Sequence, residues 1–382
     1  MSHKPLILFI APLPPPVHGS AVVSQQIKES KEINEAFDCD WINLSTSRRI
    51  DEIGKNNPVK ILRLLHVLFR TIWLLTTRQY DLCYLAITCH GSAFIKDAPF
   101  ILLCKLFKKK IVIHQHNKGM SSDIDRWPYN RLFPLCYKNA TVILLSWYLY
   151  PDIENVVLKE DVRICPNGIK VYDEIEHQNQ IAAEESVIHK STLQDNSIPH
   201  LLFLSNLIES KGVIVLLDAL KILKDKGYSF ICDFIGAETK EIDARRFDEE
   251  VKIRHLSKIA IYHGKKFGKE KEDAFDRADI FVFPTFYSNE TFGIVNLEAM
   301  AHKKPIVSTN EGGIPDIVID GVNGLISERG NPQSLSDCIS KLLESEKLRR
   351  QMGNNGYKML KEKYTQEIFE KNMISILKEL TC

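Results

Sequence analysis

Short apolar runs recur along the chain and alternate with longer segments whose apolar positions follow a helical period. In the first half, the runs lie at 6–10, 80–86, 110–113 and 140–145. Runs of this length are typical of strands in a parallel sheet, and the helical segments between them are typical of α/β proteins. The first half is therefore predicted to be a doubly wound, Rossmann-like domain.

The alternation begins again after a polar stretch of about 170–197, which is rich in Glu, Gln, Asn and His. Further strands are expected at 200–204, 230–235, 260–263, 280–283, 305–308 and 324–326. The predicted domains are 1–170 and 199–365, joined by a connection at 171–198. A last helix at about 366–382 is expected to pack back on the first domain. Because ligands bind at the carboxyl ends of parallel strands, a site between the two domains is expected.

Composition narrows the class of protein. The 382 residues exceed one ordinary core, and 44% hydrophobic with 26% charged residues is typical of a globular protein. A net charge of +1 gives no reason to expect nucleic acid. Nine cysteines without a C-x-x-C pair indicate reduced thiols and argue against zinc. The chain has no 18-residue uncharged apolar stretch, and 1–13 is interpreted as a first strand rather than a signal peptide, so a cytoplasmic location is expected.

The segment 283–300 carries the most specific pattern. Glu290 precedes a predicted helix at 291–302, and Glu298 lies about two turns inside it. The residues expected in the first turn are Phe292, Gly293 and Ile294. Their amide N–H groups would lack intrahelical partners, and together with the helix dipole they would favour an anion such as phosphate. Carboxylates on both sides of this site suggest a ligand that carries sugar hydroxyls as well as phosphate.

Three further patterns occur in order along the chain: P-N-G at 166–168, N-x4-K-G at 206–212 and E-G-G-I-P-D at 311–316. Together with the two glutamates, they resemble the retaining glycosyltransferases of the GT-B fold, the group 1 family that is also called family four. The resemblance covers nearly the whole chain and is strongest from about 200 to 330. It implies an α/β protein of GT-B architecture, with two doubly wound Rossmann-like domains facing across a cleft.

The resemblance also implies roles for single residues in the second half. Lys211 would neutralise charge on the nucleotide-diphosphate leaving group, which is electrostatic stabilisation. The family usually has Arg five residues earlier, where this chain has the uncharged Asn206. Glu298 would bind the nucleotide ribose and Glu290 the donor sugar. The alternative is a solvated Lys and two exposed helical Glu residues. Eight helical residues span about 12 Å, which exceeds the roughly 5–9.5 Å between the two carboxyl groups of a glycosidase.

In the first half, the resemblance implies a histidine beside the reaction centre. His114 and His116 both follow a predicted strand, and His116 fits the family pattern slightly better. An H-x-H metal pair is the alternative, although no third ligand is evident nearby. Gly19, in the first strand-to-helix loop, would let the backbone approach the diphosphate.

No metal or other cofactor is expected. Two Asp-x-Asp pairs, at 38–40 and 123–125, could suggest a cation-dependent sugar-nucleotide enzyme. Both are interpreted as chance, since a helix N-terminus and Lys211 already provide positive charge for a diphosphate. The Gly312-Gly313 pair is compatible either with a turn near the donor or with a simple structural turn.

An apolar helix at 58–78 with interspersed Arg, and a basic cluster at 107–110, bear on the acceptor. This helix is interpreted either as a core-packed crossover or as a peripheral contact with an anionic inner membrane.

The function expected from the sequence is sugar transfer that is retaining and metal-independent. The donor is expected to be a nucleotide-diphosphate sugar, most simply a UDP-sugar. The acceptor is expected to be a hydroxyl of a glycan or lipid-linked glycan in surface polysaccharide synthesis. The alternatives are a non-catalytic nucleotide-sugar-binding subunit of an assembly complex and an epimerase of the same fold. A dehydrogenase is disfavoured, because no G-x-G-x-x-G follows the first strand.

Overall fold

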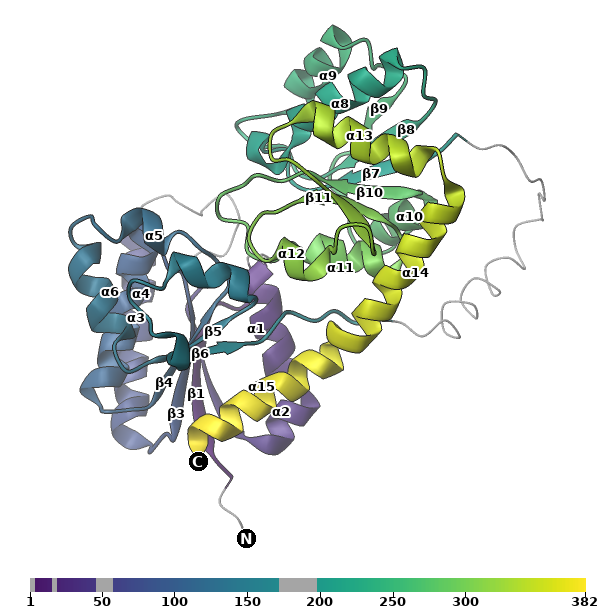
Figure 1. Cartoon of the computed structure of the whole chain (residues 1–382). Coiled ribbons are helices and arrows are strands. Elements are labelled where there is room, and N and C mark those ends of the chain that lie inside the picture. Colours follow the sequence, from purple (N-terminus) through teal and green to yellow (C-terminus); the bar gives the residue numbers. More distant parts are fainter. Residues whose placement is uncertain (1–3, 16–18, 46–57, 172–197) are drawn as a thin grey trace. The chain divides into compact units, whose positions relative to one another are not determined.

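The structure is a computed structural model that describes residues 4–15, 19–45, 58–171 and 198–382 (Figure 1). The chain divides into two compact units. The first comprises 1–167, 288–292 and 367–382, and the second comprises 168–287 and 293–366. Most of the predicted connection at 171–198 lies outside the described residues.

Among the described residues, the sheet of the first unit has six parallel strands in the order β2-β1-β3-β4-β5-β6. The strands are β1 (Leu6–Ala11), β2 (Asp38–Asn43), β3 (Leu82–Ile87), β4 (Ile111–Gln115), β5 (Thr141–Leu144) and β6 (Val162–Ile164). The helices are α1 (Gly19–Glu29), α2 (Lys31–Ala36), α3 (Pro58–Thr77), α4 (Gly91–Leu106), α5 (Met120–Asp123), α6 (Tyr129–Tyr137) and α15 (Gln366–Thr381), with 3-10 turns η2 (Trp147–Asp152) and η3 (Lys159–Asp161). The direction of winding reverses between β1 and β3, as in a doubly wound fold.

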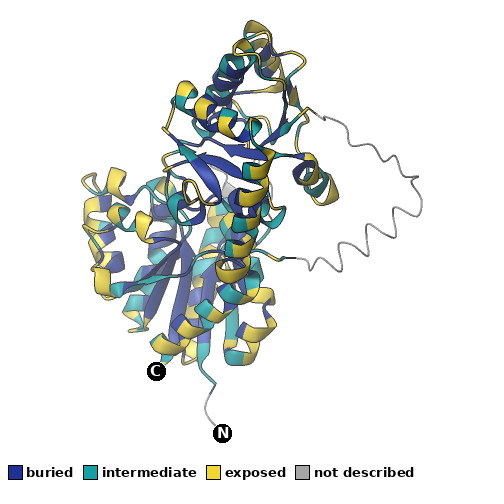
Figure 2. Cartoon of the chain, turned by 45° about the vertical axis from the view of Figure 1, so that its right-hand side comes forward, coloured by how far each residue is buried: buried dark blue, intermediate teal, exposed yellow. Residues whose placement is uncertain are grey.

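Burial follows the apolar runs of the sequence. Every residue of β3 and of β4 is buried (Figure 2), as expected for strands covered on both faces. The helix α15 joins this unit through an ion pair between Arg163 and Glu379 and through buried side chains that include Phe369 and Leu377. The last helix of the chain is thus part of the first unit.

The second unit has a sheet of six parallel strands within its described residues, in the order β12-β11-β10-β7-β8-β9. The strands are β7 (His200–Leu204), β8 (Ile231–Ile235), β9 (Ala260–Tyr262), β10 (Ile280–Phe283), β11 (Ile306–Thr309) and β12 (Gly324–Ser327). The helices are α8 (Val213–Asp225), α9 (Ala244–Ile253), α10 (Lys269–Arg277), α11 (Ile294–Ala301), α12 (Ile314–Ile317), α13 (Pro332–Leu343) and α14 (Glu346–Lys363), with the turn η4 (Glu209–Lys211). This is the Rossmann strand order, and its topological switch point lies between β7 and β10.

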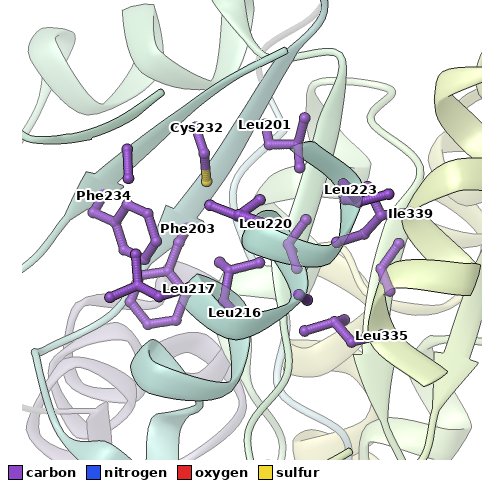
Figure 3. Packing of buried hydrophobic residues seen from close by; sticks show 14 of the residues in the cluster. Leu201, Phe203, Leu216, Leu217, Leu220, Leu223, Cys232, Phe234, Leu335 and Ile339 are labelled. Carbon is purple, nitrogen blue, oxygen red and sulfur yellow. The ribbon is translucent and has the colours of Figure 1, made fainter. Parts of the chain in front are cut away.

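A hydrophobic cluster fixes α8 on this sheet (Figure 3). The α8 side chains that point into the cluster recur at helical spacing: Leu216, Leu217, Leu220 and Leu223. They meet side chains of β7, β8 and α13, which are Leu201, Phe203, Cys232, Phe234, Leu335 and Ile339. Because α8 packs tightly on the sheet, the loop from β7 to α8 is anchored at both ends.

Candidate functional site

Backbone contacts hold the loop after β7 against the loop after β10 at the switch point. Gly212 has φ 90°, and a Cβ there would lie 2.3 Å from the carbonyl oxygen of Pro284. The N–H of Phe286 donates to the carbonyl of Ser210 at 2.8 Å. Only glycine tolerates both this φ and this approach. The two loops are therefore one local structure.

Lys211 lies in this local structure, with its ammonium group over two aromatic rings. Its Nζ is 4.5 Å from the centroid of Tyr287 and 5.5 Å from that of Phe283. Such distances are typical of cation–π contacts, which hold a cation in place. The side chain is half-buried. A positive charge is thus fixed at the carboxyl ends of β7 and β10, where doubly wound sheets bind ligands.

The helix after β10 begins later than predicted. Gly293 is the N-cap of α11 with φ 66° and ψ 62°, so the helix starts at Ile294, and Phe292 is a buried residue before it. The prediction that Phe292 and Gly293 occupy the first turn is therefore wrong. The reason is the left-handed conformation of Gly293, which glycine adopts readily and which breaks the helical path. Of the three predicted residues, Ile294 alone contributes a first-turn amide.

The revised start also removes the distance argument for the two glutamates. Glu290 lies three residues before Gly293, outside the helix, so the 12 Å helical spacing between Glu290 and Glu298 does not apply. Glu298 remains on α11, and its carboxylate accepts from Nζ of Lys271 on α10 at 2.8 Å. Both side chains are about one-quarter exposed, at 24%. Besides Lys211, the candidate site therefore contains Lys271, which pairs with Glu298 and which no sequence pattern indicated.

Segment 288–292, which carries Glu290, belongs to the first unit and contacts the loop after β4. The hydroxyl of Thr291 donates to the backbone carbonyl of His116 at 3.1 Å. Gly119 lies close to Asn289, since a Cβ on the glycine would be 3.4 Å from Oδ1 of that residue. Buried Glu290 is thus next to a residue that binds the backbone of His116, although the two predicted site residues are far apart in the sequence.

The two candidate histidines occupy different environments. The prediction that His114 follows the strand is wrong, because β4 extends to Gln115. His114 is fully buried, its Nδ1 is 2.7 Å from the hydroxyl of Tyr84, and burial and the nearby His116 lower its pKa well below the ordinary value. His114 is therefore a neutral core side chain. His116, just past the strand, is half-buried, and the two ring centroids are 4.0 Å apart.

Two other predicted residues have simpler surroundings. Gly19 is the first residue of α1 rather than a loop residue, and a Cβ there would meet no atom within 4 Å. Asn206 is exposed, and its Oδ1 accepts from the N–H of Ala237 at 3.4 Å. Neither position is constrained in the way that Gly212 is.

The E-G-G-I-P-D pattern contains a buried carboxylate that sequence reasoning passed over. Glu311 is buried, and Nη1 of Arg329 lies 2.9 Å from its Oε2. Gly312 has φ 55° and precedes the short helix α12. This turn connects the end of β11 to that helix at the same edge of the sheet as the Lys211 loop.

The Asp-x-Asp pairs are engaged in other contacts. Asp40 accepts from the hydroxyl of Tyr80 at 2.6 Å and pairs with Arg78. Asp123, which was expected in a loop, ends α5, is buried, and accepts from the N–H of Gly91 and from Arg126, both at 2.7 Å. In the described part of the chain, no three His, Cys, Asp or Glu side chains are grouped as metal ligands.

Two Rossmann-like units, each with a six-stranded parallel sheet in its described residues, give the chain the GT-B fold, as predicted. A glycosyltransferase from Rickettsia africae has this fold, with a TM-score of 0.73, 17% identity, and coverage of 99% of this chain and 98% of that one. The Anabaena protein Alr3699/HepE, solved in complex with UDP-glucose, aligns with a TM-score of 0.69 and 16% identity over 98% of this chain and 99% of that one.

Residues 184–359 match the sequence model of the family described as "Glycosyl transferases group 1". This segment is therefore similar to the group 1 glycosyltransferases. The capsular polysaccharide biosynthesis glycosyltransferase CapM of Staphylococcus aureus is 29% identical over 210 residues, which are 55% of this chain and 52% of CapM. The chain spans about half the length of these curated relatives.

Proposed function

We propose that this chain is a retaining, metal-independent glycosyltransferase that takes its sugar from a nucleotide-diphosphate donor. The expected donor is a UDP-sugar, and the acceptor is a hydroxyl of a glycan or lipid-linked glycan in surface polysaccharide synthesis. The match of residues 184–359 to the group 1 glycosyltransferase family supports the class of reaction. UDP-glucose bound to the Anabaena protein and the role named for CapM support the donor and the pathway.

The observation that carries the proposal is the position of Lys211. Its ammonium lies at the switch point of a Rossmann-ordered sheet, over Tyr287 and Phe283. The first turn of α11 follows the adjacent strand, and helix N-termini favour phosphate. A diphosphate in this position would have its charge neutralised by Lys211 as the bond to the sugar breaks. No metal is needed in this scheme.

The remaining residues receive roles by their surroundings. Glu298 would accept hydrogen bonds from the ribose hydroxyls, and Lys271 would hold its carboxylate in place. Glu290 and His116, joined through Thr291 and the backbone, would contact the donor sugar. We further propose that the sugar is transferred with retention, the leaving phosphate taking the proton of the acceptor hydroxyl on the same face.

The first test is nucleotide affinity, measured by calorimetry with UDP. Glu298→Ala should weaken UDP binding by at least about tenfold, because it removes the acceptor of a charge-assisted hydrogen bond worth about 1.5–3 kcal/mol. Lys271→Ala is the matched control, since it breaks the same ion pair but keeps the carboxylate. Its affinity should stay within about threefold of the parent.

Equal UDP affinity in the parent and in Glu298→Ala would overturn the proposed donor site. A thermal-shift panel of nucleotide sugars then identifies the donor, because a ligand that binds only the folded state raises the unfolding temperature.

A further inference from the structure

Helix α3 of the first unit is apolar on both faces. Its inner face buries Leu74 and Leu75, as a crossover helix should. Its outer face also presents large apolar side chains, each between 38% and 77% exposed: Val59, Ile61, Leu62, Leu65, Phe69, Ile72 and Trp73. The inner face therefore agrees with the core-packed interpretation, and the outer face leaves large apolar side chains exposed. Among the described residues, no helix meets the length and hydropathy of a membrane span.

The charge on α3 has a single sign. Lys60, Arg63 and Arg70 are its charged residues, and it contains no Asp or Glu. At 100° per residue, Arg63 and Arg70 lie on one flank of the outer apolar face, next to Trp73. An apolar face with a basic flank and a Trp is typical of helices that lie in the surface of an anionic membrane.

Neighbouring helices extend this surface. The helix α3 packs beside α4, and α4 packs beside α6 (Figure 1). These helices add three exposed apolar residues, namely Ile95, Leu106 and Leu135. The basic residues Lys108 and Lys109 follow α4 after its C-cap residue, Phe107. The apolar and basic character of α3 therefore continues onto adjacent elements.

The N-terminal half of α3 also reaches the ligand edge of the sheet. It lines a pocket of about 510 Å³ together with the loops after β1 and β2. The lining residues are Pro15, Asn43, Ser45, Val59, Leu62, Arg63, His66 and Val67. This edge is formed by the carboxyl ends of the strands, where open α/β sheets bind their ligands.

We propose that the outer face of α3 is a docking surface for an anionic phospholipid bilayer. This inference rests on the proposed function for its purpose, since a lipid-linked acceptor resides in the bilayer and would meet the protein at this pocket. A second copy of the chain fits the face less well. In a two-fold dimer built on this face, Arg63 and Arg70 of both copies would lie along the interface, and α3 itself contains no Asp or Glu to pair with them.

Sedimentation with vesicles tests the docking surface. The full chain should bind vesicles of phosphatidylglycerol and phosphatidylcholine, and bind less to pure phosphatidylcholine. Leu65→Glu and Phe69→Glu should each weaken binding to the anionic vesicles by at least about tenfold, because each places a carboxylate in the apolar face. Ile253→Glu is the matched control, as it changes a 71% exposed apolar residue of α9 in the second unit. It should bind like the parent.

Two further measurements test which residues contact the membrane and whether basic residues contribute to binding. The fluorescence of the parent should shift to the blue on adding anionic vesicles, and Trp73→Phe should lose most of this shift. Arg70→Gln should weaken binding about fivefold, the effect of one basic residue near an anionic surface. Vesicle binding that is unaffected by Leu65→Glu and Phe69→Glu would overturn the proposal, as would no binding or a parent that is a stable dimer in light scattering.

UDP affinity is measured on the same variants. A chain that binds UDP but no vesicles contradicts the docking surface and leaves the proposed function intact. A chain that binds vesicles but no UDP supports the docking surface and contradicts the proposed function.

Discussion

At the scale of single residues, two glycines decide how the candidate donor site is built. Gly212 allows the loop after β7 to touch the backbone of Pro284, which places Lys211 over Tyr287. Gly293 turns the chain so that α11 starts at Ile294. At Gly212, the positive φ and the backbone oxygen of Pro284 both exclude other residues. At Gly293, the positive φ is the main constraint, because the atom nearest to a would-be Cβ, 2.8 Å away, is Nδ2 at the end of the Asn296 side chain.

Gly212→Ala should therefore lower the free energy of unfolding by about 2–4 kcal/mol, since alanine is strained at this φ and must also displace a backbone oxygen. Urea unfolding of the second unit, followed by circular dichroism, measures the loss. Gly227→Ala is the matched control, because Gly227 has a similar φ of 88° and open space around it. It should cost about 1 kcal/mol. Equal losses would show that the contact with Pro284 is unimportant.

At the scale of elements, a histidine joins α10 to the end of α11. Nδ1 of His302 is 2.7 Å from Asp276, and Nε2 is 2.7 Å from Glu272. Burial by itself would lower the pKa of His302, but the hydrogen bonds and charges of the two carboxylates outweigh burial and raise it to about 9. The same two helices carry Lys271 and Glu298, so the contacts of His302 also help to position the candidate ribose site.

Stability should accordingly depend on pH through His302. Because its pKa is raised on folding, its contribution is complete below about pH 6.5 and is lost as the pH rises to about 9. We expect about 1 kcal/mol, since both carboxylates are nearly half exposed and are screened by solvent. The measurement is the difference in unfolding free energy between the parent and His302→Gln at pH 6, 7.5 and 9.5. A difference that grows with pH would contradict this assignment.

At the scale of the whole molecule, the first unit is completed by the end of the chain. Leu377 of α15 is fully buried there, and Glu379 pairs with Arg163. All four tryptophans of the sequence, at 41, 73, 127 and 147, lie in this unit. Tryptophan fluorescence therefore reports on the unfolding of the first unit alone.

Leu377→Ala should lower the free energy of unfolding seen by tryptophan fluorescence by about 3 kcal/mol, the usual loss for a buried leucine. Glu379→Gln should cost less than about 1 kcal/mol, as its pair with Arg163 is largely exposed. Leu217→Ala is the control of equal chemistry in the second unit, where Leu217 is also fully buried. It should change this transition less than Leu377→Ala does, and an equal change would contradict the assignment of α15.

Much of the architecture could be predicted from local patterns. Apolar runs such as 6–10 and 280–283 became buried strands because a strand covered on both faces must be apolar at every position. The order of the short patterns also pointed to the family whose sequence model matches residues 184–359. The start of α11 was missed, because nothing in the residues near Gly293 distinguishes a left-handed N-cap from an ordinary helical residue.

Local patterns were enough to predict the α/β class and the similarity to the group 1 glycosyltransferases, since these depend on period, composition and short motifs. Which side chains meet is visible only in the folded chain. The tertiary structure paired Glu298 with Lys271, joined Thr291 to the backbone of His116, buried His114 as a neutral side chain, and left the outer face of α3 exposed. Each of these depends on strand order and helix packing, which bring together residues that no local pattern connects.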